Sequence, residues 1–220
     1  MNDSWSTKTY WEHRFDVGDT PWELGQASTV VCEVLDELSS MGYALRGRSA
    51  LSAGCGKGAD VVEIARRGID VIAVDWASTA VADARVRYER DKTPQHGAVS
   101  FIEGDFFSIP VQCVDLSVEH TFFCAIDPSM RSRYIEQVSQ WIKPGGFLVG
   151  NFFVVGEDIV QTLPGRSLTQ AGEGPPFAAT EKELESLFSP YFVTRSLRPA
   201  ALPAPDRRPG LEWIGIFERR

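Results

Sequence analysis

Residues 51–75 read LSAGCGKGADVVEIARRGIDVIAVD: an apolar run, a glycine-rich loop, a helix-like stretch and a second apolar run follow one another directly. Within residues 60–67 the apolar side chains recur at the spacing of one helix face, and Gly68 is placed to end that helix. Residues 70–75 are rich in β-branched side chains without polar alternation, which is typical of a strand buried on both faces. The stretch therefore predicts a strand, a loop, a helix and a second, parallel strand.

The same rhythm continues along the chain and sets the fold class. Strand-like runs at 49–53, 70–75, 99–105, 114–120 and 145–155 alternate with helix-like stretches at 60–67, 78–90 and near 130–141. After a capping box from Thr180 to Glu183, two more strand-like runs are joined by a turn over 199–209, too short for a helical crossover, so we expect them to pair antiparallel. The sequence predicts a single α/β domain over 1–220, with a Rossmann-like, doubly wound, seven-stranded sheet and an antiparallel C-terminal strand.

Composition limits the partners that the chain can have. The formal net charge is −8 and no Lys/Arg-rich stripe is present, so a nucleic-acid backbone would repel it. The four cysteines form no C-x-x-C pair, and we expect reduced thiols in a cytoplasmic protein, with neither disulfides nor a metal site. The N-terminus lacks the apolar core of a signal peptide, and no apolar run is long enough to span a membrane. We therefore expect a small-molecule partner.

The glycine loop after residue 53 has the composition of a nucleotide-binding turn, although such glycines also serve in a plain tight turn. NAD-binding loops read G-x-G-x-x-G, whereas Gly54, Gly56 and Gly58 follow the spacing G-x-G-x-G. That spacing is found in enzymes that use S-adenosylmethionine (SAM). A nicotinamide-dependent oxidoreductase is the alternative, and it predicts that NAD binds in preference to SAM.

Two carboxylates follow the next strands of the predicted sheet. Asp75 ends the second strand, where a carboxylate can accept both hydroxyls of a ribose. Asp105 ends the third strand, where SAM enzymes contact the adenine amino group and pack the following residue, here Phe106, on the base; the alternative role of Asp105 is to cap a turn. Ligands of open α/β sheets bind at these strand ends, and dehydrogenase folds lack the final antiparallel hairpin. The pattern as a whole favours SAM.

Six motifs carry a resemblance to one enzyme family. In order they are TPWELGQ (20–26), LSAGCGKGADV (51–61), GDFF (104–107), HTFFCAIDPSMRSRY (120–134), KPGG (143–146) and GPPF (174–177). Over roughly residues 5–190 the chain resembles the thiopurine and halide/thiol S-methyltransferases, and it is more similar to the halide/thiol branch. The glycine loop is generic, whereas TFFCAIDP together with PWE and GPPF is specific to this family.

The resemblance implies positions for the cofactor and the acceptor. An aromatic N-terminal lid over residues 1–28 would cover SAM, and the product would be S-adenosylhomocysteine (SAH). Small family members are often monomers, and we expect the same here. The Gly- and Pro-rich stretch 156–178 is either a lid over the acceptor or a plain loop. The expected cofactor contacts are Trp11, Phe15, Trp22, Gly54, Gly56, Asp75, Trp76, Asp105, Phe106 and His120, and the expected acceptor contacts are Phe122, Arg131 and Phe177.

The chain also departs from the family pattern. The halide/thiol branch reads FDYTFFCAI, whereas this chain reads VEHTFFCAI, so that Glu119 and His120 replace Asp and Tyr. His120 is the candidate catalytic residue as a base toward a thiol; the alternatives are a cofactor contact and a packed histidine at a strand end. Ser52 stands where many SAM enzymes carry an acid that contacts the methionine amino group.

Three further side chains have two interpretations each. Phe122 either lines the acceptor pocket or belongs to the core. Arg131 either steers an anionic acceptor or forms an ion pair on the helix surface. Cys124 fits a buried structural thiol better than a nucleophile.

The expected activity is SAM-dependent transfer of a methyl group, by in-line displacement, to a small soft nucleophile: a thiol, bisulfide or halide. A thiol is partly ionised near neutral pH, so this chemistry requires no strong base. One alternative acceptor is an aromatic thiol or an N, O or S atom of a natural product. An alternative of another class is a protein that binds SAM without turnover.

Overall fold

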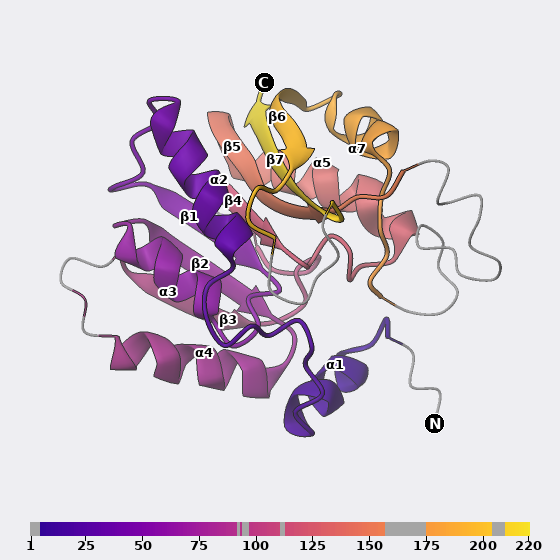
Figure 1. The fold of residues 1–220 in the computed structure, drawn as a ribbon. Coiled ribbons are helices and arrows are strands. Elements are labelled where there is room, and N and C mark those ends of the chain that lie inside the picture. Colours follow the sequence, from indigo (N-terminus) through magenta and orange to yellow (C-terminus); the bar gives the residue numbers. More distant parts are fainter. Residues whose placement is uncertain (1–4, 92, 94–96, 111–112, 157–174, 204–209) are drawn as a thin grey trace.

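The computed structural model describes residues 5–91, 93, 97–110, 113–156, 175–203 and 210–220. Seven strands form one sheet in the order β3-β2-β1-β4-β5-β7-β6 (Figure 1). The strands are β1 Ser49–Ala53, β2 Asp70–Asp75, β3 Val99–Glu103, β4 Val114–His120, β5 Ile142–Phe153, β6 Phe192–Pro199 and β7 Glu212–Arg219. The first five run parallel, and β7 is inserted antiparallel between β5 and β6.

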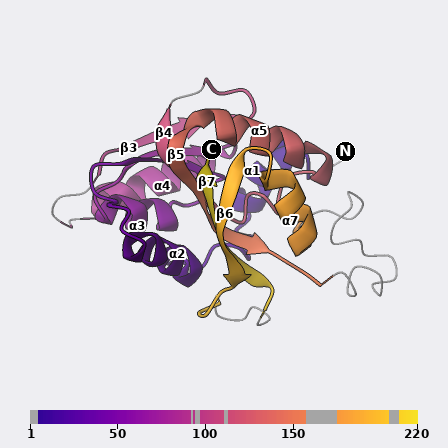
Figure 2. The ribbon, with the colours of Figure 1, turned by 90° about the horizontal axis from the view of Figure 1, so that it is seen from above.

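Helices cover both faces of this sheet. They are α1 Lys8–Asp16, α2 Thr29–Ser40, α3 Ala59–Arg66, α4 Ser78–Arg90, the 3-10 turn η1 Pro128–Met130, α5 Arg131–Trp141 and α7 Glu181–Phe188. Figure 2 shows α2 and α3 on one side of the sheet and α5 on the other. Neighbouring residues of β1 point to opposite faces, so Ala50 packs with α2 and α3 while Leu51 packs with α5 and α7. The doubly wound architecture is confirmed.

The backbone geometry of the loop explains why glycine stands at positions 54, 56 and 58. Gly54, Gly56 and Gly58 all have positive φ, a conformation that side-chain-bearing residues rarely adopt. A Cβ on Gly58 would lie 2.7 Å from Cβ of Ala84, so this glycine lets α3 approach α4. The turn is anchored to the sheet because the N–H of Cys55 donates to the carbonyl of Val74 at 3.0 Å.

Most predicted elements are confirmed, and the differences have local causes. The third strand ends at Glu103, so Asp105 lies in the following loop instead of at the strand's last position. The fifth strand begins at Ile142, because KPGG is a bulge: Val114 pairs with Ile142 and Leu116 with Phe147. Helices α1 and α2 are absent from the sequence-based prediction. Most of the predicted acceptor lid, residues 157–174, lies outside the described residues.

Within the described part of the chain, no helix combines the length and the apolar character needed to cross a membrane.

Candidate active site

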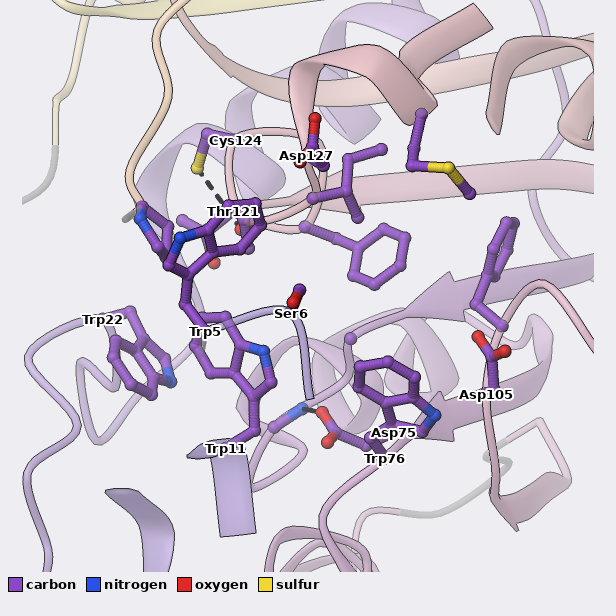
Figure 3. Close-up of a pocket in the computed structure, with 18 of the residues that line it drawn as sticks. Trp5, Ser6, Trp11, Trp22, Asp75, Trp76, Asp105, Thr121, Cys124 and Asp127 are labelled. Atoms are coloured by element: carbon purple, nitrogen blue, oxygen red, sulfur yellow. Dashed lines mark hydrogen bonds between the residues drawn. The ribbon is translucent and has the colours of Figure 1, made fainter. Parts of the chain in front are cut away.

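A cavity of about 690 Å³ opens at the carboxyl ends of the four strands β1 to β4, where the N-terminal segment covers it (Figure 3). Its volume lies within the range typical of small-molecule and cofactor sites. Of the expected cofactor contacts, nine line it: Trp11, Phe15, Trp22, Gly54, Gly56, Asp75, Trp76, Asp105 and Phe106. Residues that are far apart in the sequence, from Trp11 to Phe106, thus line one cavity.

Asp75 is fixed by the loop that it faces. One carboxylate oxygen accepts the N–H of Gly56 at 2.9 Å and the other accepts the N–H of Ala77 at 2.9 Å. Burial raises the pKa of Asp75 above its usual value, while these two N–H groups oppose the rise. The carboxylate lines the cavity beside Trp76, in the position from which it can accept ribose hydroxyls.

Asp105 caps a turn and also reaches the cavity, while its contact with an adenine stays a prediction. Its Oδ1 accepts the N–H of Phe107 at 2.9 Å and its Oδ2 accepts the hydroxyl of Ser108 at 2.9 Å, so it does cap a turn. The same side chain also lines the cavity. Next to it, Phe106 is 4% exposed and packs against Trp141 with ring centres 5.0 Å apart, giving the cavity a rigid aromatic wall.

The aromatic side chains of the N-terminal segment form a cluster on the side of the cavity that faces away from the sheet. The ring centre of Trp22 lies 5.4 Å from that of Trp11 and 5.8 Å from that of Phe15. The guanidinium of Arg14 lies 4.8 Å from the Trp22 ring centre. Trp5 extends this cluster and its ring contacts Phe177 at 4.9 Å between centres.

Trp5 was missed by the sequence analysis. The signal available was the density of aromatic residues in the segment SWSTKTYW, which the expected lid included without assigning Trp5. Figure 3 shows Trp5 between Trp22 and Thr121, at the end of the cavity that is far from Asp105.

The turn after β4 forms the floor of the cavity between its Trp5 end and its Asp105 end. Thr121 has φ 64°, and Phe122 lies so close to the glycine loop that a Cβ on Gly54 would be 2.6 Å from its Cδ2. Phe122 lines the cavity, as the acceptor-site interpretation expects, and also packs against the core ring of Phe106. Cys124 lines it too; its Sγ donates to the carbonyl of Thr121 at 3.3 Å.

Glu119 holds this turn in place from beneath. One of its oxygens accepts the N–H of Phe122 at 2.7 Å and of Phe123 at 2.8 Å, and the other accepts the hydroxyl of Tyr134 at 2.8 Å. Complete burial raises the pKa of Glu119 to about 7. The replacement of Asp by Glu in the motif therefore provides a buried, titratable support for the cavity floor.

His120 lies in a smaller side pocket of about 40 Å³ on the other side of Gly54, outside the large cavity. Its Nδ1 is 2.6 Å from Oδ2 of Asp60, and Oδ1 of Asp60 accepts the N–H of Ser28 at 2.7 Å. Glu23 lines the same pocket, and its Oε1 accepts the N–H of Lys57 at 2.8 Å. The role of His120 as a base stays a prediction that this placement does not support.

Two expected acceptor contacts lie behind the cavity wall. The prediction of a surface position for Arg131 is wrong, because this side chain is 1% exposed. Its guanidinium donates to Glu183 of α7 at 2.7 Å and to the carbonyl of Phe177 at 2.6 Å, which ties α5 to α7 and to the segment before it. Phe177 is equally buried, so its contact with Trp5 is its connection to the cavity.

The residues present fit SAM. The glycine loop, the carboxylate of Asp75 and the ring of Phe106 line one cavity together with tryptophan side chains, and tryptophan rings suit a sulfonium cation. Together with β7 inserted antiparallel in a seven-stranded sheet, this arrangement defines the class I SAM-dependent methyltransferases.

Comparisons with known proteins agree with this class. The sequence profile of the family named Thiopurine S-methyltransferase (TPMT) matches residues 6–214, and the chain belongs to this family. It is 30% identical over 211 residues to "Probable thiol methyltransferase 2" of Arabidopsis thaliana, covering 95% of this chain and 84% of that protein. It is 27% identical over 196 residues to a thiopurine S-methyltransferase of Vibrio cholerae, covering 84% and 83%.

Solved structures show the same fold. Magnesium protoporphyrin IX methyltransferase from Synechocystis PCC 6803 with bound SAH matches with a TM-score of 0.72 at 16% identity, covering 97% of this chain and 100% of that one. A SAM-dependent methyltransferase from Methanosarcina mazei matches with a TM-score of 0.68 at 22% identity, covering 82% and 96%. Membership of the TPMT family makes the protein a methyltransferase whose cofactor is SAM.

Proposed function

We propose that the protein transfers the methyl group of SAM to the sulfur of a small thiol or to a similarly soft anion. The observation that carries the proposal concerns the acids of the cavity. Among the described lining residues the carboxylates are Asp75, Asp105 and Asp127, and each accepts a backbone N–H. Because each of these acids holds the backbone of a turn and His120 lies in the side pocket, an acceptor that enters already ionised and needs no protein base fits best.

The chain's own residues then bind, orient and exclude water. SAM supplies a methyl group already activated on a sulfonium. Trp5, Trp11 and Trp22 close an apolar space in which a desolvated anion and the methyl carbon are held in line. A lone pair of the acceptor forms the bond to the methyl carbon while the carbon–sulfonium bond breaks and its electron pair stays on the cofactor sulfur. No proton leaves or enters a protein group in this step.

The names of the relatives support this acceptor class. Besides the thiol methyltransferase above, "Thiocyanate methyltransferase 1" of Arabidopsis thaliana is 28% identical over 213 residues, covering 95% of this chain and 84% of that protein. The second candidate is an aromatic thiol or a heteroatom of a larger metabolite, and the volume of the cavity favours it.

The test is SAH formation with thiocyanate, iodide, hydrosulfide, an aliphatic thiol, an aromatic thiol and, as the matched control, the phenol of the same ring. Turnover of the thiols or anions without turnover of the phenol supports the proposal. Turnover of the aromatic thiol alone selects the second candidate. Faster methylation of the phenol would overturn the soft-nucleophile assignment.

A pH profile of kcat/KM with two thiols of different pKa tests whether a protein group acts as the base. We expect the midpoint of the profile to move with the pKa of the thiol, because the thiolate is the reacting form. A midpoint that stays fixed for both thiols would show that a protein group removes the proton.

We also propose that the enzyme acts as a cytoplasmic monomer on a small-molecule acceptor. None of the four cysteines, all of which are described, forms a disulfide, which fits a reducing compartment. Light scattering after size exclusion should give the mass of one chain at micromolar concentration. A dimer that persists on dilution would contradict this.

A further inference from the structure

One aromatic side chain of the cavity has no counterpart in the family resemblance. The N-terminal aromatic positions that the resemblance implies are Trp11, Phe15 and Trp22. Trp5 precedes all three, stands before helix α1, and lines the cavity as a half-buried side chain. Its function therefore has to be argued from the part of the cavity in which it lies.

Trp5 lies at the end of the cavity from which an acceptor would approach. SAM carries its base and its methyl group on opposite sides of the ribose. With the base expected beside Phe106 and the ribose beside Asp75, an acceptor reaches the methyl group from the end away from Phe106. Figure 3 shows the Trp5 ring at that end, between Trp22 and Thr121. The indole is thus placed to meet the acceptor.

The ring that Trp5 contacts is fixed from two sides. The N–H of Phe177 donates to the carbonyl of Cys124 at 2.7 Å, and its own carbonyl accepts from the buried guanidinium of Arg131 at 2.6 Å. Two residues later, Ala179 pairs with the chain just after β5. Phe177 is also only 1% exposed. It cannot move aside for an acceptor without breaking these contacts.

The contact between the two rings closes the acceptor end. The ring centres of Trp5 and Phe177 are 4.9 Å apart and their planes are inclined by 67°, an edge-to-face arrangement that aromatic pairs favour. Pro175 and Pro176, directly before Phe177, line the cavity as well. The indole therefore rests against a fixed surface and fills space that a bulky substituent of the acceptor would need.

We propose that Trp5, held against Phe177, limits the size of the acceptor. A bare anion or a sulfur with a small substituent reaches the methyl group, whereas a large ring on the same sulfur meets the indole. This inference rests on the proposed function and names the substituents that the site admits. The volume of the whole cavity favours a larger acceptor, but that volume includes the room that SAM itself takes.

The first test compares Trp5→Ala with the wild type on methanethiol, thiophenol and 2-naphthalenethiol. The two aromatic thiols have nearly the same sulfur chemistry and differ by one fused ring, so the ratio of their kcat/KM values reports bulk. Removing the indole should raise kcat/KM for 2-naphthalenethiol relative to both smaller thiols by roughly tenfold or more, because pockets discriminate by such factors over small differences in size. Trp5→Phe should give a smaller rise.

Binding to the SAH complex tests the same limit without turnover. 2-Naphthol carries the fused ring without a thiol, and SAH has no methyl group to transfer. By calorimetry, the SAH complex of Trp5→Ala should bind 2-naphthol roughly tenfold more tightly than that of the wild type, because a vacated apolar space accepts an aromatic ring. If this gain is measured while no thiol is turned over, the size limit stands and the soft-nucleophile proposal fails.

Trp213→Ala is the matched control. Trp213 is also half-buried, its Nε1 donates to the carbonyl of Gly210 at 3.0 Å, and it lies outside the cavity. This variant should change neither the ratios nor the affinity for 2-naphthol, and thermal unfolding confirms that each variant is folded.

Two results would overturn the size limit. An equal loss of kcat/KM for all three thiols, with the affinity for 2-naphthol unchanged, would show that Trp5 only closes the site. Weaker binding of 2-naphthol by Trp5→Ala would show that the indole is a platform on which aromatic acceptors stack.

Discussion

The two walls of the cavity are held by different kinds of interaction. On the sheet side, the carboxylate of Asp75 at the end of β2 accepts the N–H of Gly56, and the glycine loop is bonded to β2 through the N–H of Cys55 and the carbonyl of Val74. Asp105 accepts the N–H of Phe107 in the loop after β3.

On the N-terminal side, α1 has one buried residue, Phe15. Apart from the aromatic contacts with Trp22, α1 is held by polar pairs at exposed side chains, such as Lys8 with Glu103 at 2.5 Å. Figure 1 shows α1 apart from the helices that flank the sheet.

This difference indicates which wall exists before the cofactor binds. Backbone bonds between buried strands open only with a large part of the fold, whereas a helix held by exposed polar contacts opens at low cost. We infer that the sheet wall is preformed and that the N-terminal wall is completed by the cofactor. The predictions below test this contrast, starting with the largest expected effect.

Gly54→Ala should damage the preformed wall most. The new Cβ would meet Phe122 at 2.6 Å in a backbone conformation that alanine adopts with strain. A strain and a steric clash of about 1–3 kcal/mol together should weaken SAM binding by roughly 5- to 150-fold, measured by calorimetry. Gly42→Ala is the control, because Gly42 has φ +90° and open space around its Cβ position. If Gly42→Ala weakened SAM binding equally, the clash at Gly54 would not be the cause.

Glu119→Gln should change how stability depends on pH. The pKa of Glu119 is raised from 4.5 to about 7, so its protonated form is favoured in the folded state. Its contribution is present below about pH 4.5 and is lost as the pH rises through 7. The glutamine variant keeps groups for the bonds to Phe122 and Tyr134. Because glutamine does not ionise, this loss of about 3 kcal/mol should be absent from the variant.

The measurement is the free energy of unfolding of both proteins from pH 5 to pH 8. The difference between variant and wild type should grow in favour of the variant as the pH rises. A constant difference would show that Glu119 does not titrate in this range.

Lys8→Met should give the smallest effect and act only on the N-terminal wall. Removing the exposed pair with Glu103 should speed amide exchange in α1 slightly, and added salt should do the same to the wild type, because exposed ion pairs are screened. Lys143→Met is the matched control, since Lys143 is similarly exposed and pairs with Asp115 away from the cavity. Equal changes in α1 for both variants would contradict the proposed role of Lys8.

The sheet wall could be predicted from the sequence because its determinants are local. The strands at 49–53, 70–75 and 114–120 have the expected bounds. A carboxylate that follows a buried parallel strand must lie at the carboxyl edge of the sheet, where ligands bind. Helix α2 could also have been found, because Val30, Val34 and Leu38 recur at helical spacing.

The remaining features depend on partners distant in sequence. Arg131 is buried because Glu183 and the carbonyl of Phe177 receive its guanidinium, and His120 turns away from the large cavity because Asp60 lies beside it. Periodicity and spacing carry no information about such pairs. The N-terminal aromatic wall was predicted through family resemblance alone, because a short helix with little apolar surface gives no signal of where it docks.

Hydrogen exchange of the protein with and without SAH tests the contrast between the two walls most directly. Amides of residues 5–28 should exchange quickly in the free protein and become strongly protected when SAH binds, while amides of β1 and β4 should be protected in both states. Protection of residues 5–28 that is already complete without SAH, or unchanged by it, would contradict a cofactor-completed wall.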